Sequence, residues 1–285
     1  MTNREVIETS LVVTGAAGRV GRALRCVWGG HVGGMPILWS GRSAGQGIDL
    51  VWNIGAEVTP PLPKSAIFLH LAGQTRGSAA ELTENHRSVQ VLCENAKNSG
   101  ALHVFFLSSV AVYPPGPRVI AEDQPADPQN DYGLAKLAAE DAARVAMSDG
   151  GLTVLRLGNL AGADTLLTSA RAGEIALDPV QGQSGGPVRS YIGPQVLAKV
   201  LAELIGLAAQ GMALPDVLNL AQPPALLMTD LLTAADANWH YGPRRAEVIP
   251  RVAVNVARLA ALVDLPDATA ASVIADLNGL KGRWP

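Results

Sequence analysis

A glycine-spaced turn near the start of the chain constrains the fold more than any other feature of this sequence. An apolar run ends at Thr14, a helical pattern begins at Val20, and between them the chain reads Gly15-Ala16-Ala17-Gly18-Arg19-Val20-Gly21. In such a turn the first glycine permits a tight bend, the second lets the backbone approach a pyrophosphate, and the third lets the helix pack against the strand. The helix N-terminus adds free N–H groups for the phosphates. The pattern predicts a dinucleotide site with contacts at Gly15, Ala17, Gly18, Arg19, Val20 and Gly21.

Short apolar runs alternate with helical patterns through the first two thirds of the chain. The pattern predicts strands over residues 10–14, 37–40, 66–72, 103–108 and 152–157, and helices over 20–28, 80–99 and 132–147. Apolar strands separated by helices are typical of a parallel sheet, and right-handed crossovers make it doubly wound. After about residue 158 the alternation decays. We therefore predict an α/β fold with a dinucleotide-binding Rossmann domain over residues 1–160. A smaller, mainly substrate-binding part follows over 161–285, and some of its elements return to the first domain.

Composition excludes several classes of protein. The net charge is −3 and charged residues make up 16% of the chain, so there is no electrostatic footprint for nucleic acid or an anionic membrane. The most apolar long helical pattern, residues 196–209, is interrupted by Lys199 and Glu203 and does not suit a membrane span. Cys26 and Cys93 cannot build a disulfide framework, and the histidines lack metal-ligand spacing. We expect a reduced, cytoplasmic protein without a metal, a nucleic-acid partner or a membrane partner.

The loop after the second predicted strand bears on which dinucleotide binds. A site specific for NAD usually places an acidic residue there to hold the adenosine ribose. This loop has none, whereas Arg42 and Ser43 could bind a 2′-phosphate by charge and hydrogen bonding. The alternative is a solvent-exposed arginine after a glycine turn. We predict NADP as the preferred cofactor and NAD as the other possibility, with Asp49 and Leu50, after the presumed third strand, near the adenine.

A hydroxyl-bearing strand end and a later helix carry residues suited to proton transfer. The strand predicted over 103–108 runs into Ser109, and Tyr132 and Lys136 lie four residues apart in the next helix, on one face. A lysine ammonium beside a phenol favours the phenolate and lowers the phenol pKa from about 10. Such a pair suits proton exchange with an alcohol or ketone, and Ser109 could hold the substrate oxygen. Alone, the pair could equally be a surface pair on a helix.

Together, the glycine turn, Ser109, Tyr132 and Lys136 resemble the extended short-chain dehydrogenase/reductase family of nucleotide-sugar epimerases, dehydratases and ketoreductases. The resemblance implies that Ser109, Tyr132 and Lys136 are catalytic, and that Tyr132 and Lys136 also contact the cofactor. The strand end after His70 resembles the family's His-Leu-Ala-Ala segment, which implies further cofactor contacts at Leu71, Ala72 and Gly73.

The same resemblance implies substrate contacts. Asn85 stands where the family has an asparagine near its active site, although the flanking residues are atypical. Asn159 resembles an asparagine that touches a nucleotide-sugar, and Arg189 resembles an arginine that binds substrate phosphates. The family's following His-Val-Asp-Asp is replaced here by the segment Gly193–Val196. The resemblance thus implies a sugar substrate, with the nucleotide part left open.

Two reactions remain within the resemblance. Val110 and Ala111 replace the acidic pair of the family's 4,6-dehydratases, and Ala111 replaces the cysteine of its 3,5-epimerases. We expect hydride transfer between the nicotinamide and a sugar hydroxyl or keto group. An NAD-dependent 4-epimerase is the alternative within the family, and a non-catalytic NADP-binding redox sensor is the alternative of another class.

The resemblance also implies a homodimer in which two helices pair with their copies. The helical patterns over 80–99 and 132–147 carry apolar side chains that would form this interface: Leu82, Val89, Leu92, Leu137 and Ala138. The alternative is that these side chains simply face the sheet.

Overall fold

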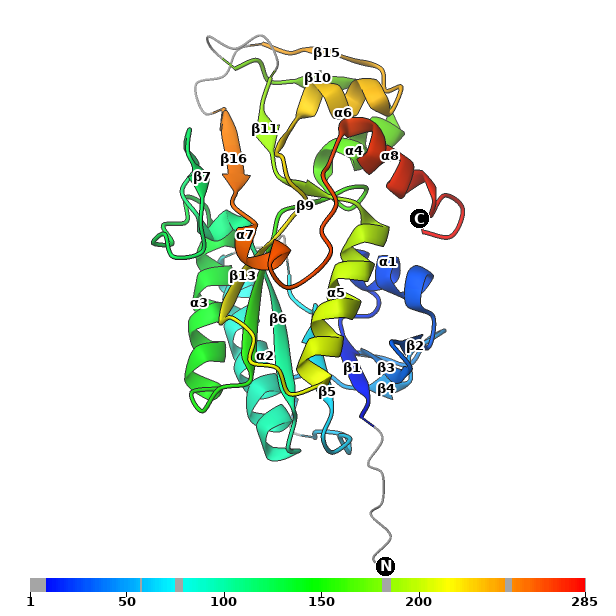
Figure 1. Cartoon of the computed structure of the whole chain (residues 1–285), viewed down its shortest axis with the longest axis vertical. Helices are drawn as coiled ribbons and strands as arrows, with labels where there is room; N and C mark the ends of the chain where they lie inside the picture. The colour runs from blue at the N-terminus through cyan, green and yellow to red at the C-terminus, as the bar shows by residue number, and fades with distance from the viewer. Residues whose placement is uncertain (1–8, 57, 75–78, 181–185, 244–247, 285) are drawn as a thin grey trace, which may run out of the picture. The chain divides into compact units, whose positions relative to one another are not determined.

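The computed structural model describes residues 9–56, 58–74, 79–180, 186–243 and 248–284, and an eight-stranded sheet is its largest element (Figure 1). The strand order is β13-β8-β6-β5-β1-β3-β2, with β4 beside β3. The strands are β1 (Leu11–Thr14), β2 (His31–Val32), β3 (Met35–Gly41), β4 (Leu50–Val51), β5 (Ile67–His70), β6 (His103–Ser109), β8 (Leu152–Leu157) and β13 (Val217–Leu220). Strand β1 pairs in parallel with β3 and β5, and β5 pairs in parallel with β6. This order confirms the predicted doubly wound α/β fold.

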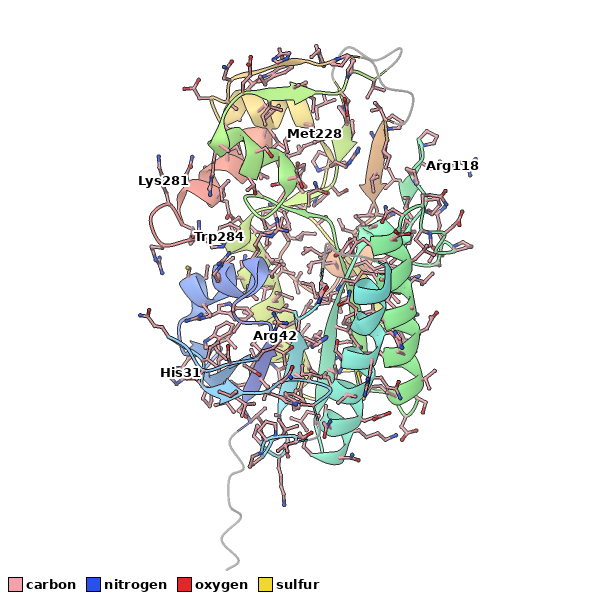
Figure 2. All side chains as sticks on the ribbon, turned by 180° about the vertical axis from the view of Figure 1, so that it is seen from behind. His31, Arg42, Arg118, Met228, Lys281 and Trp284 are labelled. Atoms are coloured by element: carbon pink, nitrogen blue, oxygen red, sulfur yellow. The ribbon has the colours of Figure 1, made fainter. Side chains whose placement is uncertain are left out.

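Burial explains why the central strands read as continuous apolar runs. Every residue of β1, β5 and β8 is buried, as expected where helices cover both faces of a parallel sheet. The helices that alternate with these strands are α1 (Arg19–Trp28), α2 (Ala79–Asn98), α3 (Asp131–Ala146) and α5 (Pro194–Ala209). Figures 1 and 2 both show α2 and α3 side by side.

The edge of the sheet departs from the prediction in two places. A short strand, β2, forms an antiparallel hairpin with β3 through Gly33 and Gly34, whose φ angles of 56° and 84° suit a tight hairpin turn. We expected a short third strand to end before Asp49 and Leu50. This is wrong, because Asp49 comes directly before β4, which begins at Leu50. A strand of two residues leaves too little pattern to place its ends.

The chain divides into two compact units that interleave along the sequence. The first comprises Met1–Ser108, Leu134–Val154 and Ala202–Asp216, and the second comprises Ser109–Gly133, Leu155–Leu201 and Val217–Pro285. The second unit has small sheets in the orders β14-β11-β16-β7, β10-β15 and β12-β9. Its strands are β7 (Val119–Ile120), β9 (Asn159–Leu160), β10 (Ile175–Leu177), β11 (Val188–Arg189), β12 (Tyr191–Ile192), β14 (Leu226–Leu227), β15 (Trp239–Tyr241) and β16 (Arg251–Val254). Its helices are η1 (Val110–Val112), α4 (Thr165–Ala172), α6 (Met228–Ala234), α7 (Ala257–Ala260) and α8 (Ala270–Asn278).

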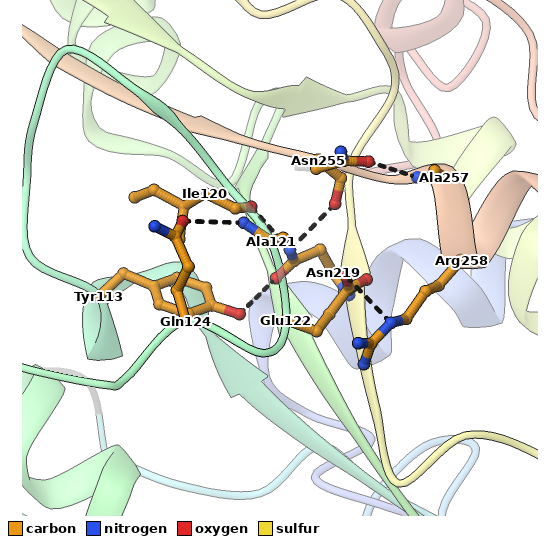
Figure 3. Close-up of polar contacts among 9 residues, drawn as sticks. All are labelled: Tyr113, Ile120, Ala121, Glu122, Gln124, Asn219, Asn255, Ala257 and Arg258. Carbon is orange, nitrogen blue, oxygen red and sulfur yellow. Dashed lines mark hydrogen bonds and ion pairs between the residues drawn. The ribbon is translucent and has the colours of Figure 1, made fainter.

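A network of buried hydrogen bonds connects the segment that follows Ser109 to β13, within the second unit (Figure 3). Asn219 on β13 is its centre: its side-chain amide donates to the carbonyls of Ile120 and Asn255, and its oxygen accepts from the Tyr113 hydroxyl at 2.9 Å. The Asn219 backbone N–H donates to Glu122 at 3.0 Å, and Arg258 lies 3.7 Å from the same carboxylate. These bonds satisfy polar groups that would be costly to bury unpaired.

Candidate functional site

The glycine turn has the geometry that its spacing predicts. Gly15 has a φ of +77°, which favours glycine, and a Cβ there would lie 2.7 Å from the Ala72 backbone nitrogen. A Cβ at Gly21 would collide with the Gly15 carbonyl oxygen, so the third glycine allows close packing of α1. Gly18 precedes the first residue of α1 and donates a hydrogen bond to the Gly15 carbonyl at 2.9 Å. Strand, turn and helix are therefore arranged as in a phosphate-binding turn.

A cavity of about 550 Å³ opens beside this turn, where β1, β3, β4 and β5 end. That volume lies within the range of small-molecule sites. Of the residues predicted to bind cofactor or substrate, those in its lining are Gly15, Ala17, Gly18, Arg42, Leu71, Ala72, Gly73 and Asn85. The other lining residues are not among those predicted from the sequence to bind cofactor or substrate: Thr14, Ser40, Gly41, Trp52, Asn53, Ile54, Gly55, Ala56, Gln74, Arg87 and Ser88. Arg19, Val20, Gly21, Ser43, Asp49 and Leu50 are outside the lining.

The cavity lining contains no carboxylate among the residues that the structure describes. Asp49 accepts a hydrogen bond from the Trp39 backbone N–H at 3.0 Å and stands outside the lining. The residues that follow β4, Trp52 and Asn53, line the cavity instead. Arg42, at the end of β3 (Figure 2), also lines it. The hydroxyl of Ser40 is buried in the lining and has no hydrogen-bond partner among the described residues, so a bound polar ligand could satisfy it. These features fit a dinucleotide.

Lys136 is a buried ammonium that is outside the cavity lining but close to one lining residue, Gly73. Its side chain lies on α3 and is only 5% exposed; Nζ donates to the Leu107 carbonyl at 2.9 Å and lies 5.1 Å from the centre of the Phe106 ring. A Cβ on Gly73, a lining residue, would be 3.4 Å from Nζ. Burial lowers the Lys136 pKa to about 8, although the nearby Glu140 carboxylate acts in the opposite direction. Lys136 is therefore mostly charged at neutral pH and lies next to Gly73 of the lining.

The buried side chains of His70 and Asn85 each contact a residue of the cavity lining. The ring nitrogen Nδ1 of His70 is 2.7 Å from the Thr14 hydroxyl, directly before the glycine turn. Burial, with a smaller contribution from the Lys136 charge, lowers the His70 pKa to about 3, so the ring is neutral. Asn85 accepts from the Gln74 N–H at 2.8 Å and donates to the Gln74 carbonyl at 3.0 Å. Asn85 therefore holds the backbone beside Gly73.

Ser109 and Tyr132 both belong to the second unit. The Ser109 hydroxyl caps η1 by accepting from the Ala111 N–H at 3.2 Å. Tyr132 is the half-buried second residue of α3, and its neighbour Gly133 packs so tightly on the Ala111 carbonyl that a Cβ would collide with it. The start of α3 is thereby held against the turn that follows Ser109. The catalytic roles of Ser109, Tyr132 and Lys136 remain predictions.

Asn159 and Arg189, which the resemblance places at the substrate, have partners inside the second unit. The Tyr191 hydroxyl donates to Asp164 at 3.0 Å and also hydrogen-bonds the Asn159 side chain. Arg189 donates to the carbonyls of Val188 and Ile249 at 2.8 and 2.9 Å. Burial lowers the Arg189 pKa from its usual value. Both predicted side chains are thus held in place by their neighbours.

The segment Gly193–Val196, which stands in place of the family's His-Val-Asp-Asp, has no acidic residue of its own. A carboxylate from far along the chain contacts it instead. The first turn of α5 begins at Pro194 and has no acidic side chain. Instead, Asp276 on α8 accepts from the backbone N–H groups of Gln195 and Val196 at 2.8 and 3.0 Å. A carboxylate at a helix N-terminus satisfies free N–H groups and the helix dipole. The C-terminal helix α8 therefore caps α5.

A second cavity, of about 1010 Å³, lies in the second unit where α4, α6 and α8 end. None of the residues predicted from the sequence to bind cofactor or substrate lines it. In the described parts of the chain, no helix is long and apolar enough to cross a membrane.

Comparisons with known proteins agree with this arrangement. The sequence model of the family described as "NAD dependent epimerase/dehydratase family" matches residues 11–175, more than half of the chain. A search of curated protein sequences gives no significant match.

Solved structures share the fold over nearly the whole chain. MoeE5, in complex with UDP-glucose and NAD, has a TM-score of 0.73 at 20% identity, covering 94% of this chain and 97% of its own. UDP-N-acetylglucosamine 4-epimerase from Bacillus cereus has a TM-score of 0.75 at 15% identity, covering 95% and 98%. UDP-glucose 4-epimerase from Thermus thermophilus, in complex with NAD, has a TM-score of 0.74 at 17% identity, covering 96% and 99%. The family match, the fold and the glycine-lined cavity together show that this chain belongs to the NAD dependent epimerase/dehydratase family, a family of enzymes.

Proposed function

We propose that this protein is a nicotinamide-dependent oxidoreductase acting on a hydroxyl or keto group of a sugar, with a nucleotide-sugar as the expected substrate. The observation that carries the proposal is the buried Lys136 ammonium beside Gly73, because one of the predicted proton-transfer residues then lies next to the lining of the cavity at the glycine turn. The complex of MoeE5 with UDP-glucose and NAD supports a nucleotide-sugar as substrate.

The roles of the side chains follow from their chemistry. A nicotinamide dinucleotide in the cavity would supply or accept the hydride. Tyr132 exchanges a proton with the substrate oxygen, and Ser109 holds that oxygen by a hydrogen bond. Lys136, four residues after Tyr132 on α3, favours the phenolate with its positive charge and binds the nicotinamide ribose.

A 4-epimerase is the second candidate, because two of the three structures described above are 4-epimerases of UDP-sugars. Incubation with UDP-sugars and either dinucleotide separates the two reactions. Net change in reduced nicotinamide that matches product formation supports the dehydrogenase or reductase. Conversion to the 4-epimer without net change in reduced nicotinamide supports the epimerase.

We further propose that the cofactor is NADP rather than NAD. The cavity lining includes Arg42 and Arg87 and, among the described residues, no Asp or Glu. A 2′-phosphate would be attracted to these guanidinium groups, whereas no carboxylate of the described lining is present to hold the ribose hydroxyls.

An Arg42→Ala variant should bind NADPH at least about tenfold more weakly, the loss expected for one charge-assisted hydrogen bond. Its affinity for NADH should change little, because NADH lacks the 2′-phosphate. Fluorescence titration of both cofactors measures the two affinities, and Arg22→Ala on α1, outside the lining, is the matched control. Equal affinities of the unmutated protein for NADPH and NADH would contradict the NADP preference.

We also propose a homodimer, but through a different set of side chains. Val89 and Leu92 are 1% and 0% exposed, so they face the core of their own protomer and the prediction that they form an interface is wrong. The side chain of Leu82 lies outside the described residues. On α3 the exposed apolar side chains are Leu134, Ala138 and Val145, with Leu134 54% exposed and Val145 77% exposed. Their spacing of four and seven residues places them on one stripe of the helix.

A Val145→Glu variant should therefore be a monomer at micromolar concentration, because a charge would be buried in the paired helices. Light scattering measures the mass, for which a monomer is 29.6 kDa. The control is Met212→Glu, which adds the same charge at another exposed apolar site. A monomeric unmutated protein would contradict the homodimer.

A further inference from the structure

Glu140 is a fully buried carboxylate one helical turn beyond Lys136. It lies on α3 and is 0% exposed. The Ser108 hydroxyl donates to Oε1 at 2.6 Å, and Arg144 donates to Oε2 at 2.9 Å. Burying a carboxylate is costly unless it is paired and hydrogen-bonded, and these two contacts fix both of its oxygens. Ser108 is the residue directly before Ser109, so Glu140 is tied to the end of β6.

The surroundings of Lys136 show why a fixed negative charge matters there. The ammonium is buried against the Leu107 carbonyl and the Phe106 ring. Burial lowers its pKa to about 8, and Glu140 is the group that raises it. Among the described residues, the titratable group facing it from the sheet is His70, which is neutral because burial lowers the pKa of its ring to about 3. Asn85, close to Gly73 from α2, carries no charge.

We propose that Glu140 is a positioning residue for the reaction: held by Ser108 and Arg144, its carboxylate keeps the buried Lys136 ammonium charged. This inference rests on the proposed function of Tyr132 and Lys136. Along α3 the spacing of four residues then puts a phenol, an ammonium, a carboxylate and a guanidinium on one side of the helix, at Tyr132, Lys136, Glu140 and Arg144. Glu140 acts through Lys136 and is not itself expected to touch the substrate.

The direct test is titration of the lysines of the chain by NMR after labelling of their ε-carbons, with Lys136 assigned from Lys136→Arg. Glu140→Gln removes the charge and keeps an oxygen that can accept from Ser108. The Lys136 midpoint should fall by about one pH unit in this variant, the smaller end of the shift expected from a nearby opposite charge. Asp141→Asn removes a neighbouring carboxylate that is largely exposed and also pairs with Arg144, and should leave the midpoint unchanged. An unchanged midpoint in Glu140→Gln would overturn the proposal.

A second variant keeps the test valid if Glu140→Gln does not fold. Arg144 is partly exposed and pairs with Glu140 from the next turn. Arg144→Gln removes a positive charge while Ser108 still holds the Glu140 carboxylate, so the Lys136 midpoint should rise rather than fall. A lowered Lys136 midpoint in Arg144→Gln would contradict the proposed electrostatic effect of Glu140 on Lys136.

Phenolate absorbance separates this inference from the proposed function. The chain has four tyrosines, and subtraction of the Tyr132→Phe titration isolates Tyr132. Lys136→Met should raise the Tyr132 midpoint, and Glu140→Gln should move it in the same direction. No change in Lys136→Met would contradict the Tyr132–Lys136 pair and hence the proposed function. A Tyr132 midpoint that rises in Lys136→Met but not in Glu140→Gln would contradict only the proposed role of Glu140.

Discussion

Replacement of Tyr132 by phenylalanine should reduce kcat by about 10²–10⁴-fold, the range for loss of a positioned proton-transfer group. The change removes a single oxygen and preserves the ring, and Tyr132 is only half-buried near the start of α3. Cofactor affinity should remain within a few-fold, because the ring and its packing are kept and only one oxygen is lost. Steady-state kinetics with the substrate found by the UDP-sugar assay measures kcat, and fluorescence titration measures the cofactor.

Tyr241→Phe is the matched control for Tyr132→Phe. Tyr241 lies on β15, is 43% exposed and stacks edge-on against Trp239, so it also loses only a hydroxyl. This variant should retain full activity. Full activity in Tyr132→Phe as well would refute the assignment of the acid/base and revive the non-catalytic redox sensor.

Replacement of Lys136 by methionine should reduce both kcat and cofactor affinity, since the ammonium serves both the phenol and the nicotinamide ribose. We expect at least about a 10²-fold loss of kcat. Methionine matches the length of the lysine stem and suits the site between Leu107 and Phe106. Folding should therefore survive, which circular dichroism and thermal unfolding can verify. Unchanged cofactor affinity would contradict the second role of Lys136.

The lowered pKa of Lys136 also predicts that the free energy of unfolding depends on pH, with Lys136→Met as the reference. The Lys136 pKa is about 8 in the folded protein and 10.5 when unperturbed, so between these values the unfolded state binds more protons. The free energy of unfolding of the unmutated protein should therefore rise relative to Lys136→Met as pH increases from 8 to 10.5. Denaturant titrations of both proteins across this interval measure the difference. A difference that is constant with pH would contradict the lowered pKa.

The parts of the fold that the sequence predicts are those set by local patterns. The strand before Gly15, the helix after Gly18 and the buried strand ending at His70 need no distant partner to be recognised. The glycines at positions 15 and 21 are required by contacts with backbone only a few residues away or on the adjacent strand. The doubly wound order then follows from general rules of chain connection.

Other features depend on partners far away in the sequence. Asp276 caps a helix that begins far earlier in the chain, at Pro194, and no pattern around either residue indicates the contact. Apolar spacing on α2 cannot distinguish a core face from a dimer face, which is why the interface prediction for Val89 and Leu92 is wrong. Because β4 begins at Leu50, Trp52 and Asn53 line the cavity instead of Asp49, and a strand of two residues is too short for periodicity to locate.

The most direct test of the central claim is a transfer experiment with a sugar substrate deuterated at the reacting carbon. The unmutated protein is incubated with NADP or, separately, NAD and with each of a set of UDP-sugars, and the nicotinamide is analysed for deuterium by mass spectrometry. We predict deuterium in the nicotinamide with the unmutated protein, and a rate of transfer at least about 10²-fold lower with Tyr132→Phe. An equal rate of transfer in both proteins, or no transfer to NADP or NAD from any UDP-sugar tested, would contradict the proposed oxidoreductase.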